Sequence, residues 1–255
     1  MIEIKSLQYE ISGKQILKDI DALFEPGKLN VILGPNGSGK STLLKLISGI
    51  LKSENGEINY HSKPISAIKT EEFAKYRAVL SQNIEVVFDI TVKEMVTMGR
   101  YPHFHLSPTR IDKEIINQSL EKFGLIDFQY RNYRTLSGGE QQRVQFARIY
   151  AQIWDETQQA ILLLDEPLSF LDISFQYEFM ELISEMKKRK NITIIGVLHD
   201  LNLAAKYADV IFLLKRGKLK FQGTVAEVLH ENNILNVFGI KPEISIIDQK
   251  VRIYF

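Results

Sequence analysis

A glycine-rich loop between an apolar strand and a helix restricts the fold of this chain more than any other feature. A mainly apolar run over residues 29–33 stops at Gly34, and a helical pattern follows over residues 42–47. This order predicts a strand–loop–helix unit, which is the start of a parallel α/β sheet.

The loop has the spacing G-x-x-x-x-G-K-[ST], and its residues are Gly34, Pro35, Asn36, Gly37, Ser38, Gly39, Lys40 and Ser41. Glycines let the backbone curl so that successive N–H groups point inward at a phosphate. The following helix presents its positive N-terminal end to the same anion. We expect Lys40 to reach the β- and γ-phosphates, Ser41 to offer its hydroxyl to Mg²⁺, and Thr42 to complete the nucleotide site.

A glycine-rich turn with an incidental lysine would look the same in isolation. The strand before the loop and the helix after it favour the phosphate site instead. The loop does not choose among kinases, GTPases and ATPases, so other residues must decide.

A second apolar strand, over residues 161–164, ends in the adjacent acids Asp165 and Glu166. At the tip of that strand, Asp165 can hold Mg²⁺ opposite Ser41. Glu166 is then free to orient and deprotonate a water aimed at the γ-phosphate. A strand that merely ends in a polar turn is the alternative, and the phosphate loop upstream argues for the catalytic pair.

Composition excludes several other classes of function. With 255 residues and 45% hydrophobic composition, the chain can form one large α/β domain, or a domain plus a smaller lobe. Lys and Arg number 32 against 31 Asp and Glu, so no basic surface for nucleic acid is expected. There is no cysteine, which excludes disulfides and thiolate sites. No secretory leader and no membrane-spanning run is expected, so any work at a membrane needs a partner.

The pattern along the chain predicts three parts. Residues 1–86 carry the first part of a nucleotide-binding core, residues 87–158 a helical subdomain, and residues 159–255 the second part of the core. Helical spacing dominates residues 91–150, whereas strands are expected at residues 160–164, 192–198 and 210–214, with a helix over residues 176–188. The step Arg216-Gly217 is typical of a hairpin turn, and residues 244–255 are expected to be strand.

A third motif lies about a hundred residues after the phosphate loop and consists of Leu136, Ser137, Gly138, Gly139, Glu140, Gln141, Gln142 and Arg143. It resembles the signature motif of ABC-type ATPases. In that family the loop, also at a helix N-terminus, binds the γ-phosphate held by the other subunit. Ser137 and the amides of Gly138 and Gly139 are suitable donors. A capped helix start describes the same residues and does not conflict with this role.

Further residues stand where the resemblance to that family requires them. It implies that Gln82 contacts Mg²⁺ and the attacking water, and that His199 contacts the γ-phosphate. Residues 169–172 are similar to the D-loop, with Asp172 at the subunit contact, and Tyr9 is placed like the aromatic residue that stacks on adenine. Packing within a strand is the alternative for Tyr9. One departure is the bulk of Leu168 and Phe170, where the family usually has small residues.

The resemblance covers nearly the whole chain and implies a fold, cofactors and partners. The fold is α/β, a RecA-like phosphate-loop NTPase with a mixed sheet core, N-terminal antiparallel β strands and an inserted helical subdomain. The cofactors are ATP and Mg²⁺. The partners are a second copy in a homodimer, a permease dimer that holds the chain at the cytoplasmic face of the cell membrane, and indirectly a substrate-binding protein.

Two other classes of function remain as alternatives. One is a soluble ABC protein of DNA repair or the ribosome, which would carry a long coiled coil or two ATPase units. The other is a phosphotransferase with a phosphate loop, which would not need residues 136–140.

The cargo is indicated by two segments. Residues 91–94 followed by 99–103 resemble ATPases that import iron chelates and cobalamin. Residues 147–154, followed by the polar stretch 155–159, are similar to haem-import ATPases, and ferric siderophore or cobalamin import is the alternative. His103 and His105 are expected to lie at a surface near the permease rather than to bind haem, because cargo crosses through the permease.

Overall fold

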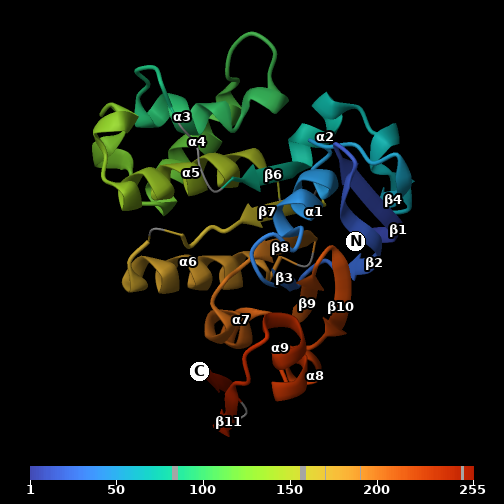
Figure 1. Cartoon of the computed structure of the whole chain (residues 1–255). Helices are drawn as coiled ribbons and strands as arrows, with labels where there is room; N and C mark the ends of the chain where they lie inside the picture. Colours follow the sequence, from blue (N-terminus) through green and yellow to red (C-terminus); the bar gives the residue numbers. More distant parts are fainter. Residues whose placement is uncertain (82–85, 156–158, 170, 190, 248–249) are drawn as a thin grey trace.

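The computed structural model describes the whole chain except residues 82–85, 156–158, 170, 190 and 248–249 (Figure 1). A six-stranded sheet with the order β10-β9-β3-β8-β7-β6 forms its centre. The strands are β3 (Leu29–Leu33), β6 (Arg77–Leu80), β7 (Ala160–Asp165), β8 (Ile192–Val197), β9 (Val210–Lys215) and β10 (Lys218–Gly223). The strands predicted at residues 29–33, 160–164, 192–198 and 210–214 are confirmed to within one residue.

Pairing is parallel from β9 through β3, β8 and β7 to β6, and only β10 is antiparallel to its neighbour. The turn between β9 and β10 contains Arg216 and Gly217, both with positive φ. Two successive residues with positive φ are typical of the tight turn that matches the twist of two paired strands. The predicted hairpin turn is therefore confirmed.

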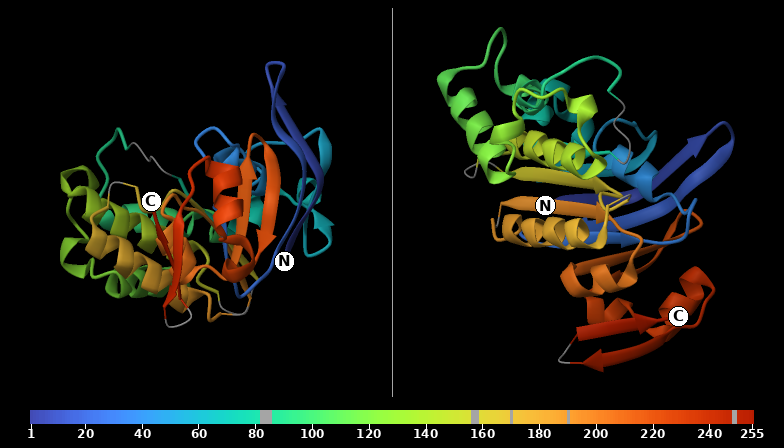
Figure 2. Two further views of the ribbon diagram at one scale, coloured as in Figure 1. Left: turned by 60° about the horizontal axis from the view of Figure 1, so that its bottom comes forward. Right: turned by 90° about the vertical axis from the view of Figure 1, so that its left-hand side faces the viewer.

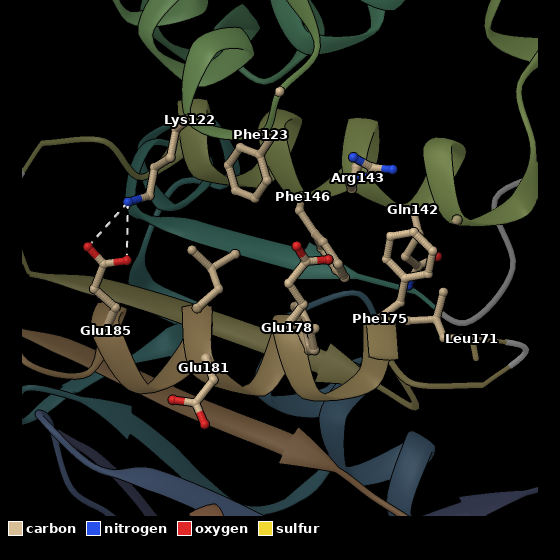
Figure 3. A pocket seen from close by; sticks show the side chains of 14 residues that line it. Lys122, Phe123, Gln142, Arg143, Phe146, Leu171, Phe175, Glu178, Glu181 and Glu185 are labelled. Carbon is tan, nitrogen blue, oxygen red and sulfur yellow. Dashed lines mark hydrogen bonds and ion pairs between the residues drawn. The ribbon is translucent and has the colours of Figure 1, made fainter. Parts of the chain in front are cut away.

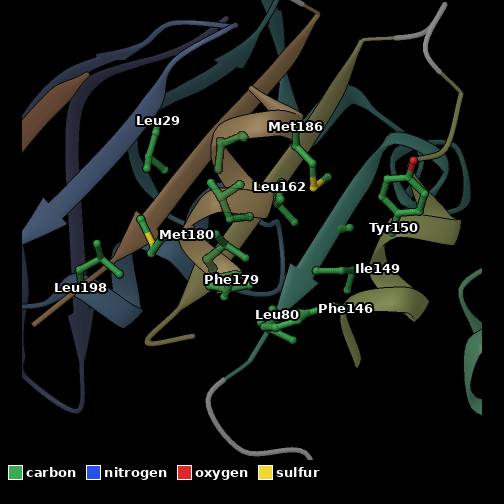
Figure 4. Close-up of a cluster of buried hydrophobic side chains, with 14 of the residues drawn as sticks. Leu29, Leu80, Phe146, Ile149, Tyr150, Leu162, Phe179, Met180, Met186 and Leu198 are labelled. Carbon is green, nitrogen blue, oxygen red and sulfur yellow. The ribbon is translucent and has the colours of Figure 1, made fainter. Parts of the chain in front are cut away.

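Side chains on both faces of the central sheet are buried, as expected of parallel strands covered by helices. Every residue of β3 and β8 is buried. Alternation along β3 sends Val31 and Leu33 into one core and Ile32 into the other. In the first core, α5 (Gly138–Gln152) and α6 (Ile173–Met186) pack on the sheet, and Phe146 stacks on Phe179 with ring centroids 4.1 Å apart (Figure 4).

A second sheet, with the order β2-β1-β4-β5, is antiparallel throughout. Its strands are β1 (Ile2–Ile11), β2 (Lys14–Phe24), β4 (Asn55–Tyr60) and β5 (Lys63–Pro64). The N–H of Lys18 in β2 donates to the carbonyl of Gly217 in the hairpin turn, which joins the two sheets. These strands confirm the antiparallel N-terminal region.

The helical lobe, defined here as α3 to α5, lies between β6 and β7 in sequence. Its helices are α3 (Val92–Met98), α4 (Arg110–Lys122) and α5 (Gly138–Gln152). Each helix begins with a capping box, in which a hydroxyl and a carboxylate three residues later satisfy free N–H groups. The helical character predicted for residues 91–150 is confirmed, while the exact division into three parts stays a prediction.

The remaining elements surround the central sheet. Two helices precede the helical lobe in the sequence, α1 (Lys40–Ile47) and α2 (Thr70–Tyr76). The elements that follow β7 are α6 (Ile173–Met186), α7 (Leu201–Tyr207), α8 (Val225–Val228), α9 (Glu231–Phe238), β11 (Glu243–Ile247) and β12 (Lys250–Tyr254). The β11–β12 hairpin lies at the opposite end of the molecule from the helical lobe (Figure 2). Asn202 of α7 exchanges hydrogen bonds with the backbone of Ile253 and so fixes that hairpin.

A buried ion pair joins two segments of the helical lobe. Arg100 Nε lies 2.9 Å from Asp112 Oδ1, and both side chains are almost fully buried. Burial alone would raise the pKa of the Asp112 carboxyl, but hydrogen bonds from Thr109 and the charge of Arg100 hold that pKa below its usual value. Asp112 therefore stabilises the fold above its ordinary pKa, and this contribution is lost as the pH falls through the lowered pKa.

We predict that Asp112→Ala lowers the free energy of unfolding by about 3–5 kcal/mol at neutral pH, because Arg100 is left buried without its partner. Glu114→Ala on the same helix is the control. Its partner Arg110 is exposed, so the loss should stay below about 1 kcal/mol. Urea unfolding followed by circular dichroism measures both, and the Asp112→Ala deficit should shrink as the pH drops below the ordinary carboxyl value of 3.8. Equal losses in the two variants would contradict the argument.

Candidate functional site: a phosphate-binding cleft

The ends of three neighbouring strands meet at one edge of the central sheet. In the register of the sheet, Ile32 of β3 and Asp165 of β7 both pair with Val197 of β8. The residues that follow this row are therefore brought together, although they are far apart in the sequence. They form a cleft of about 570 Å³, lined by Asn36, Gly37, Gly39, Lys40, Ser41, Thr42, Glu166 and His199.

The phosphate loop is shaped by close backbone contacts that only glycine allows. A Cβ on Gly34 would lie 2.2 Å from the carbonyl oxygen of Leu214 in β9, and a Cβ on Gly39 would lie 2.7 Å from the Leu17 side chain in β2. Gly39 also has a φ of 105°, which side-chain-bearing residues rarely adopt. The loop thus depends on both sheets for its position.

Lys40 lies across the loop that precedes it. Its Nζ donates to the carbonyl oxygens of Gly34 at 2.9 Å and Pro35 at 3.1 Å. Burial lowers the pKa of the Lys40 ammonium, whereas the nearby charges of Glu166 and Asp165 oppose that shift. The loop therefore has a partly buried cation at its centre, as anion binding requires.

Ser41 and Asp165 form the second feature of the cleft. The Ser41 hydroxyl, in the first turn of α1, donates to Oδ1 of Asp165 at 2.9 Å. Burial raises the pKa of Asp165, and the negative charge of Glu166 adds to that rise, while the Ser41 hydrogen bond opposes it. A hydroxyl and a carboxylate side by side are oxygen ligands of the kind that Mg²⁺ prefers.

Glu166 and His199 form the third feature. His199 Nε2 lies 2.6 Å from Oε1 of Glu166, and the two side chains are 44% and 17% exposed. Glu166 has a φ of 51°, a left-handed conformation that is uncommon for a residue with a side chain and that clusters at functional sites. The carboxylate and the imidazole together can orient a water molecule and move its proton.

The signature residues lie elsewhere on the chain. The Ser137 hydroxyl caps α5 by accepting from the N–H of Glu140 at 3.4 Å, and it donates to the Glu140 carboxylate at 2.8 Å. Ser137 and Gly138 are exposed. Gly139 faces the ring of Phe175 in α6. The lining of the phosphate cleft does not include these residues, so a single chain does not bring the signature loop to its own phosphate loop.

The other predicted residues have varied settings. Asp172 is an exposed N-cap of α6, and the N–H of Phe175 and the hydroxyl of Ser174 hold the pKa of its carboxyl below the usual value. Tyr9 lies opposite Leu17 between β1 and β2 and packs against the second core, outside the cleft lining. Gln82 falls outside the described residues, so its predicted role is not addressed by the structure.

Leu168, Phe170 and His103 are further residues that the sequence singled out. Leu168 is partly buried against the first core, and Phe170 lies outside the described residues. The ring of His103 is 2.9 Å from the carbonyl of Gln152, and burial lowers the pKa of that ring. His103 thus has a contact within the helical lobe, and among the described residues no group of three possible metal ligands occurs.

Sequence reasoning missed one contact beside the cleft. Gln142 Nε2 donates to the carbonyl oxygen of Pro167, directly after Glu166, at 2.9 Å. Its spacing of three residues from Gly139 places both on one face of α5, but nothing in the sequence indicated that this face meets the segment after β7.

Comparison with known proteins agrees with this geometry. A family profile described as ABC transporter matches residues 17–169, which is more than half of the chain. The chain belongs to the ABC transporter family. It is therefore an ATP-binding, ATP-hydrolysing member, and the kinase and GTPase alternatives left open by the phosphate loop are excluded.

Two relatives of this ABC ATPase cover almost all of it. The hemin import ATP-binding protein HmuV of Escherichia coli O157:H7 is 38% identical over 94% of this chain and 92% of its own length. The petrobactin import ATP-binding protein FpuC of Bacillus anthracis is 39% identical over 96% of this chain and 89% of its own length.

Solved structures share the fold of this ABC ATPase. A metal-chelate type ABC transporter in an inward-facing conformation matches with a TM-score of 0.82 at 24% identity, covering 100% of this chain and 96% of the other. A dimeric bacterial ABC transporter cassette matches with a TM-score of 0.75 at 25% identity, covering 88% and 99%. Cassettes of this fold thus occur as dimers.

We predict that Gly34→Ala weakens ATP binding by this ABC ATPase more than about tenfold, because the new methyl group would force the loop away from β9. Gly13→Ala is the control for backbone strain, since Gly13 has a φ of 78° but nothing within 4 Å of a Cβ. Titration with a fluorescent ATP analogue measures both, and the control should bind normally. Unchanged affinity in Gly34→Ala would show that the loop does not need this contact.

Proposed function

We propose that this chain is the ATP-hydrolysing subunit of an importer that carries haem, and that it works as a head-to-tail homodimer. One observation carries the hydrolysis: Lys40, Ser41, Glu166 and His199 follow three strand ends and line one cleft, and Asp165 accepts a hydrogen bond from Ser41 beside it. A cation, a hydroxyl–carboxylate pair and a carboxylate–imidazole pair are the parts that phosphoryl transfer to water requires.

Each residue has a role that follows from its setting. Lys40 and the loop amides bind the β- and γ-phosphates. Ser41 and Asp165, with Gln82 as predicted from the family, would hold Mg²⁺, which neutralises charge on the phosphates and offsets the burial of the Asp165 carboxyl. Glu166 accepts a proton from the attacking water, and His199 orients Glu166 and the γ-phosphate.

The position of the signature residues supports a composite site. Ser137, Gly138 and Gly139 are suited to bind a phosphate but lie outside the cleft of their own chain. In a two-fold dimer the same surface is used twice, so each signature loop can close the cleft of the partner, with Asp172 at the contact. Two ATP molecules would then hold the dimer together.

Transport needs a partner in the membrane. No helix among the described residues is both long and apolar enough to cross a bilayer. We propose that a permease dimer holds the chain at the cytoplasmic face of the membrane, next to the segment around Tyr101 and His103. Closure and opening of the ATPase dimer would shift that permease between inward- and outward-facing states.

Haem is the cargo that the relatives support best, since hemin import proteins from several bacteria are 36–41% identical to this chain. A ferric siderophore is the second candidate, which the petrobactin import relative supports at 39% identity.

We predict that Glu166→Gln leaves ATP binding intact, traps an ATP-loaded dimer and lowers turnover by about 10²–10⁴-fold, the usual contribution of a general base. Phosphate release measures turnover, and size-exclusion chromatography with ATP measures the dimer. Glu181→Gln, an exposed change on α6 outside the cleft, is the matched control and should behave normally. Parental turnover in Glu166→Gln would mean that another group is the base.

The cargo is tested on the intact transporter, purified with its permease and substrate-binding protein and placed in liposomes. We predict that haem-loaded binding protein raises ATP turnover several-fold and that haem accumulates inside, whereas a ferric siderophore does neither. Glu166→Gln transporter should show neither response. Stimulation by the siderophore alone would replace haem as the cargo while leaving the ATPase assignment intact.

A further inference from the structure

We propose that Gln142 is a positioning residue that links the two ATP sites of the dimer. It ties the helix that carries the signature residues to the backbone beside Glu166 of the same chain. The inference rests on the proposed composite site, because only then do these two ends of the link serve different nucleotides.

The link is a direct hydrogen bond from the helical lobe to the catalytic segment. Gln142 Nε2 donates to the Pro167 carbonyl oxygen at 2.9 Å, a normal distance for this type of bond. Pro167 follows Glu166, whose left-handed backbone sets the direction of its carboxylate. The Pro167 carbonyl belongs to the peptide unit that follows Pro167, and the proline ring fixes the φ between that unit and Glu166. A shift of this carbonyl is therefore passed to Glu166 through a stiff residue.

Gln142 belongs to one contact face of α5. Gly139, Gln142 and Arg143 are spaced i, i+3 and i+4, so they lie on the same side of the helix. A Cβ on Gly139 would lie 3.3 Å from the ring of Phe175, and the Arg143 guanidinium lies over that ring, 5.0 Å from its centroid (Figure 3). Phe175 in turn donates its N–H to Asp172. The signature end of α5 thus packs against the start of α6.

The segment on the other side of this contact is held by its own bonds. Ser169 N–H donates to the Glu166 carbonyl, and the Gln176 amide donates to the carbonyls of Leu168 and Leu171 at 3.4 and 3.0 Å. These bonds keep the turn compact, so movement of Pro167 is passed on to Glu166 rather than absorbed.

The space beside the contact allows such movement. A cavity of about 430 Å³ lies between the helical lobe and α6, and Gln142, Leu171 and Phe175 are part of its lining (Figure 3). Phe146 on Phe179 and Arg143 over Phe175 hold α5 against α6 beside this cavity. Densely packed interfaces resist displacement, whereas the cavity leaves room for the lobe to rotate about this contact, and Gln142 carries that movement to the Pro167 carbonyl.

The distance along α5 is short. Gln142 is five residues after Ser137, which corresponds to about 8 Å along a helix. When Ser137 of one chain engages ATP held by the partner, α5 is drawn toward that ATP. Through Gln142 the same motion sets Glu166 for the ATP held by its own chain, so binding at one site prepares hydrolysis at the other.

The proposed link is tested by placing two substitutions either in the same copy of the chain or in opposite copies. In a transporter purified with its permease and carrying two distinguishable ATPase copies, Glu166→Gln in one copy leaves only the ATP held by the other copy to be hydrolysed. Adding Gln142→Met to the copy with the intact Glu166 should lower turnover a further 3- to 10-fold, about the effect of one lost hydrogen bond. Adding Gln142→Met to the copy that already carries Glu166→Gln should change nothing, because the base of that copy is already absent. Equal turnover in the two arrangements would overturn the proposal.

Cooperativity supplies a second readout with a matched control. Gln142→Met and Gln176→Met both remove a donor to the segment after Glu166, but only Gln142 belongs to the helical lobe. Both should lower the maximal rate, whereas only Gln142→Met in both copies should bring the Hill coefficient for ATP to about 1. Gln142→Lys, which keeps a donor of similar length, should restore part of it. Equal Hill coefficients in both glutamine variants would contradict the link.

A wrong arrangement of the composite site would give a different experimental result from a wrong Gln142 link. If Ser137→Ala in one copy left turnover unchanged, the proposed arrangement of the dimer would be wrong. If Ser137→Ala lowered turnover but the placement of Gln142→Met made no difference, only the link would be wrong.

Discussion

The parallel pairing of β3, β8 and β7 is the constraint on which the site depends. In parallel strands all carboxyl ends meet at one edge, and the shared row of Ile32, Val197 and Asp165 fixes which residues emerge together. The phosphate loop, His199 and Glu166 follow that row directly. Backbone hydrogen bonds therefore hold the reacting groups in place before any nucleotide binds, which is the preorganisation that charge stabilisation requires.

The second sheet and the helical lobe have different relations to this edge of the central sheet. The antiparallel sheet closes against Gly39 from β2 and limits how the loop can relax. The lobe contributes nothing to its own cleft lining but carries the exposed signature residues. One part of the proposed composite site is thus rigid and local, and the other part is presented outward, which is the arrangement that the proposed dimer requires.

Between these parts, the contacts of α5 with Pro167 and Phe175 give the lobe a physical path to Glu166, the proposed catalytic carboxylate. One interaction is polar, the hydrogen bond from Gln142 to the Pro167 carbonyl, and the other is the Arg143 guanidinium over the Phe175 ring. A cavity beside it lets the lobe move. Such a contact can respond to the partner's nucleotide without any change in the packed core of the sheet.

The sequence by itself determined the strand–loop–helix unit, the acidic strand end and the helical lobe, because each follows from local periodicity, glycine spacing and short motifs. Lys40, Ser41, Asp165 and Glu166 could be assigned to one nucleotide site from the phosphate loop and the acidic strand end, whereas His199 was predicted from the resemblance to ABC-type ATPases. Only the tertiary structure decided that Gln142 reaches Pro167 and that Tyr9 packs against the second core. Those contacts depend on how two distant helices and sheets are placed, and side-chain packing across such distances leaves no local pattern in a sequence.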